Sequence, residues 1–62
     1  MSEFKLNIHT NNSAFDGDAD SEIARLLREA ADSIELGGVG RHTRSLVDYN
    51  GNRVGGYKLE DN

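Results

Sequence analysis

Three aspartates alternate with small residues in Asp16-Gly17-Asp18-Ala19-Asp20, which is the spacing with which a calcium-binding loop begins. In such a loop alternate carboxylates converge on one hard cation, a glycine occupies the sixth position and a glutamate the twelfth. Those positions here hold Ser21 and Leu27. Acidic residues before and within the first turn of a helix are stabilised by the helix dipole without an ion, so we predict no metal site.

A glycine-rich segment resembles the end of a phosphate-binding loop, whose backbone amides cradle phosphate groups. It reads Gly37-Gly38-Val39-Gly40-Arg41-His42-Thr43. A phosphate-binding loop leads into the N-terminus of a helix, where the dipole attracts anions. This segment instead follows a predicted helix, so we interpret its glycines as a helix stop and a flexible connector.

The remaining side chains that could do chemistry are His9, His42 and scattered serines. Nucleophilic catalysis needs a base and an orienting group around a fixed nucleophile, and no such arrangement is evident. The chain has 62 residues and no cysteine, which excludes disulfides and leaves too little interior for a closed substrate pocket. We therefore expect no enzyme, no catalytic residue and no cofactor.

Residues 3–9 alternate between apolar and polar side chains, which predicts a strand with one face in water. From Ile23 to Ile34 the apolar residues recur at i, i+3, i+4, i+7, i+8 and i+11, the spacing of one helical face. Asp18 is the expected N-cap and Gly37-Gly38 the expected stop, so the predicted helix spans 19–36.

The pair Asn50-Gly51 predicts a β-hairpin over residues 44–60, with a turn of two residues or of three with Gly51 as a bulge. Val54 and Tyr57 differ in parity along the second strand of this hairpin. They share a face only if an extra residue is inserted, and we expect a β-bulge at Gly55-Gly56.

These elements predict one α+β domain over residues 1–62 with the order β-α-β-β. A helix between the first two strands leaves room for the third strand to pair between them, so we expect an antiparallel sheet of order 1-3-2. One helix covers one face of such a sheet, and Phe15 is expected to fold back over the core. The predicted polar residues of the uncovered face are Lys5, Asn7, His9 and Arg53.

Eleven acidic and seven basic residues give a net charge of −4, distributed unevenly. Residues 1–38 hold eight acids and three bases, whereas residues 39–62 hold three acids and four bases. The acidic part could imitate nucleic acid toward a basic partner, or the basic stretch 41–44 could contact phosphate. Helical i,i+4 pairs, Arg25–Glu29 and Arg28–Asp32, would neutralise part of this charge locally.

The small core and the uncovered sheet face favour a homodimer, because self-association would supply the missing buried area. No apolar run behind a basic N-terminus marks the chain for secretion or for a membrane. We therefore expect a cytoplasmic protein without a membrane partner. Nucleic acid is a less favoured partner, because the net charge is negative and no exposed aromatic platform is evident.

Four segments together resemble short proteins encoded by bacteriophages and prophages, most of them without assigned function. The segments are Phe-Lys-Leu-Asn-Ile-His-Thr (4–10), Asn-Ser-Ala-Phe (12–15), Ile-Ala-Arg-Leu-Leu-Arg-Glu-Ala-Ala-Asp-Ser-Ile-Glu (23–35) and Asp-Tyr-Asn-Gly-Asn-Arg-Val-Gly (48–55). The resemblance covers about residues 4–59 and implies a phage-type protein in a bacterial cytoplasm. It also implies a function in binding a host protein or complex, such as a CRISPR effector or another defence complex.

Two surfaces are candidates for that contact. One is the acidic start of the helix, with Asp16, Asp18, Asp20 and Glu22. The other is the exposed side of the hairpin, with Tyr49, Arg53 and Tyr57. Two other functions stay open. A nucleic-acid-binding accessory protein would use Arg41, Arg44, Arg53 and Lys58, and a virion or assembly component would be held together by strand-edge pairing.

Overall fold

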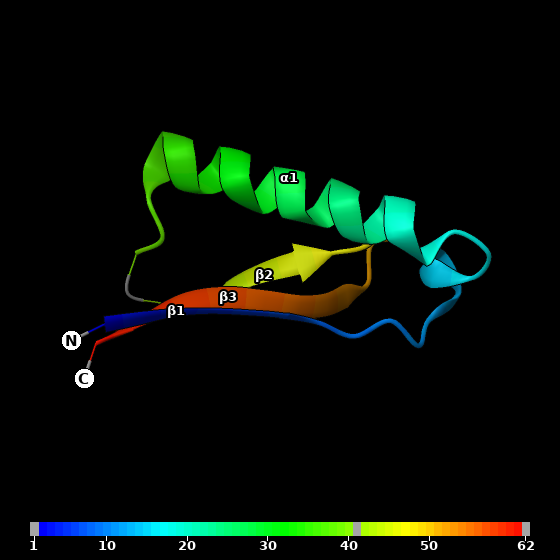
Figure 1. The fold of residues 1–62 in the computed structure, drawn as a ribbon, viewed down its shortest axis with the longest axis horizontal. Helices are drawn as coiled ribbons and strands as arrows, with labels where there is room; N and C mark the ends of the chain where they lie inside the picture. Colours follow the sequence, from blue (N-terminus) through cyan, green and yellow to red (C-terminus); the bar gives the residue numbers. More distant parts are fainter. Residues whose placement is uncertain (1, 41, 62) are drawn as a thin grey trace.

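The structure, a computed structural model, describes residues 2–40 and 42–61 and has the predicted α+β architecture (Figure 1). Its elements are β1 (Ser2–Ile8), the 3₁₀ turn η1 (Ser13–Phe15), α1 (Ala19–Gly37), β2 (Arg44–Val47) and β3 (Arg53–Asp61). The strands form one antiparallel sheet in the order β1-β3-β2, and α1 lies over one face of it. The predicted strand order is confirmed.

Helix α1 begins and ends within one residue of its predicted bounds. Its N-cap is Asp18, whose Oδ1 accepts the backbone N–H of Ser21 at 3.1 Å while Oδ2 accepts the Ser21 hydroxyl at 2.7 Å. Gly38 closes the helix with φ 78°, and its N–H donates to the carbonyl of Ile34 at 2.7 Å. Glycine suits this position because L-residues rarely adopt positive φ.

The core lies between α1 and the strands. Leu6 of β1 pairs with Tyr57 of β3, and Leu46 of β2 pairs with Gly55, so these positions share the covered face. The buried apolar residues are Ala14, Phe15, Leu26, Ala30, Leu46, Val54 and Tyr57. Phe15 packs into this cluster from η1, as predicted.

Strand β3 carries a bulge, one residue before the predicted place. Leu46 pairs with Gly55 and Val47 with Arg53, which leaves Val54 between them without a partner on β2. The insertion brings Val54 and Tyr57 to the same face, as expected. Gly55 is not the inserted residue but allows the strands to approach closely, because a Cβ on Gly55 would collide with the backbone carbonyl of Asn7 in β1.

The hairpin takes the three-residue form of the two that the sequence allows. The Asp48 N–H donates to the carbonyl of Asn52 at 2.9 Å, and the Gly51 N–H donates to the carbonyl of Asp48 at 3.0 Å. Gly51 has φ 88°, the left-handed conformation that this turn requires at its last position. Tyr49 therefore stands at the tip of the turn.

We expect Leu26→Ala to lower the free energy of unfolding by about 2–5 kcal/mol, because Leu26 is 1% exposed and its truncation leaves a cavity. A chain of this length has a total free energy of unfolding of roughly 3–9 kcal/mol, so the substitution removes a large part of it. Urea titration followed by circular dichroism measures the loss. The matched control is Leu36→Ala on the same helix, where the side chain is 91% exposed. Equal losses in the two variants would contradict the assigned core.

Candidate functional site

The acidic start of α1 does not form one free surface. Asp18 is the helix cap, and Glu22 is only 6% exposed and bonded within the molecule. Asp16 and Asp20 are exposed. The prediction that Glu22 is available to a partner is therefore wrong, because its carboxylate is turned into the fold.

Glu22 and Arg25 join α1 to the hairpin turn. Glu22 Oε1 accepts Arg25 Nε at 2.7 Å, and Oε2 accepts both Arg25 Nη2 at 2.8 Å and the backbone N–H of Tyr49 at 3.1 Å. Arg25 Nη2 also donates to the carbonyl of Val47 at 3.3 Å, and Nη1 donates to Glu29. The predicted Arg25–Glu29 pair is thus confirmed; within residues 2–40 and 42–61 no ion pair joins Arg28 to Asp32.

Asp48 joins the same turn to the loop before the helix. It is 4% exposed, and its Oδ2 accepts the side-chain amide of Asn12 at 2.7 Å. Its Oδ1 accepts the backbone N–H groups of Asn50 and Asn52, both at 2.9 Å. We call Asn12, Glu22, Arg25 and Asp48 the polar clamp, because together they connect η1, α1 and the hairpin.

The hydrogen bonds of the polar clamp hold both carboxylates ionised. The Arg25 guanidinium lowers the pKa of Glu22 and outweighs burial, which acts in the opposite direction; the Tyr49 N–H adds to the lowering. For Asp48, burial is the largest influence and raises the pKa, but the bonds from Asn52, Asn12 and Asn50 together leave the pKa below its usual value. Each carboxylate therefore stabilises the fold only while it is charged.

The hairpin residues predicted to bind a partner lie on different sides of the molecule. Tyr49 is 64% exposed at the turn, and Arg53 is exposed on the uncovered face, where its Nε donates to Ser45 Oγ at 3.1 Å. Tyr57 is 4% exposed in the core, so its predicted place on the exposed side of the hairpin is wrong. The bulge at Val54 is the reason, since one inserted residue sends Arg53 and Tyr57 to opposite faces.

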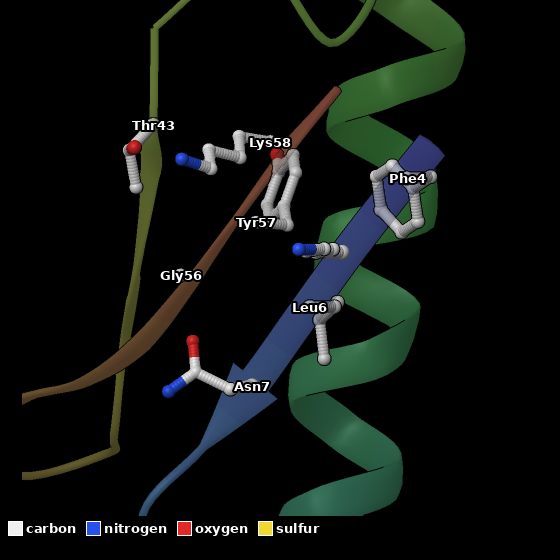
Figure 2. Close-up of a pocket in the computed structure, with 8 residues that line it drawn as sticks. Phe4, Leu6, Asn7, Thr43, Gly56, Tyr57 and Lys58 are labelled. Carbon is white, nitrogen blue, oxygen red and sulfur yellow. The ribbon is translucent and has the colours of Figure 1, made fainter. Parts of the chain in front are cut away.

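The uncovered sheet face is polar and hollowed around Gly56, which has no side chain to fill the space. A trough of about 620 Å³ lies there, and Lys5, Asn7, Thr43 and Lys58 contribute side chains to its lining (Figure 2). These residues come from β1, from β3 and from the segment just before β2. The predicted placement of Lys5, Asn7 and Arg53 on this face is confirmed by the register.

Glu60 neutralises the two lysines of this face. Lys5 and Lys58 are paired across β1 and β3, and Glu60 lies 3.0 Å from Lys5 Nζ and 2.9 Å from Lys58 Nζ. These lysines, Lys58 foremost, lower the pKa of Glu60. Glu60 was not among the predicted site residues, although Lys58 and Glu60 share a face by strand parity and Glu3 faces Glu60 across the strands. The trough is therefore not a free cationic site.

The residues proposed for nucleic acid do not gather either. Arg44 pairs with Tyr57 and its Nε donates to the carbonyl of Val39, while Arg53 is on the uncovered face and Lys58 is engaged by Glu60. Arg41 lies outside the described residues. In the described part of the chain no three His, Asp or Glu side chains stand close enough to bind a metal, and α1 lacks the apolar length needed to cross a bilayer.

Stability should fall in acid because of the polar clamp. Both carboxyls have lowered pKa values in the fold, from ordinary values of 4.5 for Glu22 and 3.8 for Asp48. The unfolded chain therefore takes up protons first, and the stabilisation present at neutral pH is lost as the pH falls below about 4. Thermal midpoints measured by circular dichroism between pH 7 and pH 2, at steps of about one unit, test this dependence.

We expect Glu22→Gln to lower the midpoint at pH 7 and to flatten its fall in acid, because the charged bond to Arg25 is lost at every pH. Asp16→Asn, which neutralises an exposed acid outside the polar clamp, should leave both the midpoint and the acid slope as they are. A Glu22→Gln profile parallel to that of the unmodified chain would refute the assignment.

Comparison with known proteins adds nothing to this geometry. No family model, no curated protein and no solved structure matches the chain.

Proposed function

We propose that this chain is a non-enzymatic, phage-type binding protein that occupies a basic surface of a host protein complex in the bacterial cytoplasm. A nucleic-acid-binding surface of a defence complex, such as a CRISPR effector, is the kind of partner that fits. The observation that carries the proposal is the separation of charge between the two layers of the fold.

The helix layer is acidic and the strands are not. Residues 16–37 hold seven acids and two arginines, whereas β1, β2 and β3 together hold four bases and three acids. The polar clamp and the helix cap use part of the acidic charge. Asp16, Asp20, Asp32 and Glu35 remain exposed along the helix layer. Exposed carboxylates gathered on one layer of the fold complement a basic surface that binds phosphates.

A protein partner is favoured over a nucleic acid for the same reason. Affinity for nucleic acid comes from neutralising phosphates with clustered lysines and arginines. Here Arg44, Arg53 and Lys58 are divided between two faces, and each already has a partner within the fold. The acidic helix layer would repel a phosphate backbone, so the alternative function as a nucleic-acid-binding accessory protein has less support.

The test is a pull-down from host lysate with the tagged chain at low salt. We expect a stoichiometric protein complex that dissociates as salt rises, since exposed charge pairs are screened. Asp16→Lys and Asp32→Lys should each weaken capture roughly tenfold, because each places a positive charge against a basic partner. The recovered complex is then purified, and its affinity for each variant is measured by titration.

Asp61→Lys is the matched control, because it makes the same charge change at an exposed position at the end of β3, outside the helix layer. Its affinity should stay close to that of the unmodified chain. Recovery of the chain alone would overturn the proposal. Equal weakening by Asp32→Lys and Asp61→Lys would show that net charge, and not the helix layer, determines binding.

A further inference from the structure

The two free edges of the sheet differ in how well they could accept another strand. Strand β2 has four residues, its pairing is broken by the bulge, and Arg25 occupies the carbonyl of Val47. Strand β1 has seven residues in continuous register with β3. A long and regular edge is a template for further pairing, whereas a short and bulged edge is protected.

The backbone groups that β1 presents to its free edge follow from its pairing with β3. The His9 N–H donates to the carbonyl of Val54 at 2.6 Å, and the Asn7 carbonyl lies against Gly55. Odd-numbered residues of β1 therefore bond to β3. In an antiparallel ladder the bonding alternates, so Phe4, Leu6 and Ile8 direct their N–H and C=O groups outward.

We propose that a second copy of this chain pairs with this edge, β1 against β1 in antiparallel orientation, with Phe4 on the two-fold axis. The axis stands perpendicular to the sheet, because that is the two-fold operation that makes strands antiparallel. The product is a six-stranded sheet with both helices on one side. The proposal is independent of the proposed host partner.

Charge selects the register. With Phe4 on the axis, Glu3 lies opposite the partner's Lys5, and the same pair recurs by symmetry. With Lys5 on the axis two lysines would face each other, and with Glu3 on the axis two glutamates would. Directly opposite like charges destabilise a sheet, and opposite charges stabilise it. A register centred on Leu6 sets Lys5 against the partner's Asn7 and forms no ion pair.

Side-chain exposure supports the same register. Phe4 is 45% exposed although it lies on the covered face. Leu59, its pairing partner on β3, is also 45% exposed. Leu6 and Ile8 already pack against the chain's own core. Centring the pair on Phe4 brings the two Phe4 side chains together between the helices. The dimer thus covers the aromatic side chain that the single copy leaves half in water.

Cysteine cross-linking tests the register, because the chain has no cysteine of its own. Residues that share a two-fold position in an antiparallel pair have Cα atoms about 5.5 Å apart, within the range of a disulfide. We expect Phe4→Cys to oxidise to a covalent dimer on a non-reducing gel. Leu6→Cys, on the same strand and face, should cross-link at least about tenfold more slowly, since each copy is displaced by two residues from the axis.

Charge exchange tests the ion pairs by sedimentation equilibrium. Lys5→Glu should weaken the dimer roughly tenfold, because both pairs become repulsive. The double variant Glu3→Lys/Lys5→Glu should restore it. Lys58→Glu is the matched control: Lys58 contacts the same Glu60, but β3 is inside the sheet, so the dimer should persist. Circular dichroism confirms that each variant is folded.

Faster cross-linking of Leu6→Cys than of Phe4→Cys, or failure of the double variant to recover, would overturn the register. The dimer itself would be overturned if the chain sedimented as a single copy at all concentrations and formed no cross-link. It would also be overturned if the chain formed open-ended polymers. Asp32→Lys, which tests the host partner, leaves β1 unchanged, so the two proposals fail separately.

Discussion

One helix packed on one face of a three-stranded sheet is the constraint from which the other features follow. Among residues 2–40 and 42–61 the apolar core has seven buried residues, of which Leu26 is the most completely enclosed. Packing of this extent offsets little more than the conformational entropy of so short a chain. The loop η1 therefore folds back to add Ala14 and Phe15 to the core, and the remaining connections must be held by polar bonds.

The polar clamp supplies those bonds in a setting where unpaired charges would be costly. Burying a carboxylate is unfavourable unless its oxygens are bonded, and both buried carboxylates accept three hydrogen bonds. Across residues 2–40 and 42–61 no buried side-chain polar atom lacks a partner. Two of these bonds join segments far apart in sequence: the Tyr49 N–H donates to Glu22, 27 residues away, and the Asn12 side-chain amide donates to Asp48, 36 residues away. Glu22 and Asp48 therefore hold the hairpin turn against the start of α1 and the loop before it.

Local signals predicted the elements of this fold well. The helix stripe from Ile23 to Ile34, the cap at Asp18 and the Asn-Gly turn each act through neighbouring residues, which a sequence shows directly. Two kinds of feature were missed. In the sequence, Glu22 and Arg25 are three residues apart and resemble an ordinary surface ion pair. The burial of Glu22 depends on the hairpin turn, 27 residues away, which local spacing does not show. The bulge position likewise depends on which residues of β2 and β3 face each other, a pairing between strands that residue spacing along the chain does not encode.

The exposed acidic side chains and the free strand edge lie on different parts of this fold, so the two proposed contacts would not compete for one surface. The exposed acids lie on the helix layer, while β1 carries only Glu3 and Lys5 among charged residues. Edge pairing in the proposed dimer therefore leaves the acidic layer uncovered. In the proposed dimer the two-fold axis is perpendicular to the sheet, so both acidic layers would face the same side and the proposed basic partner would meet two helices at once. Two linked contacts bind more tightly than one when the geometry allows both. In that dimer the free edge of β1, which a single copy must protect from aggregation, would set the spacing of the two acidic helices.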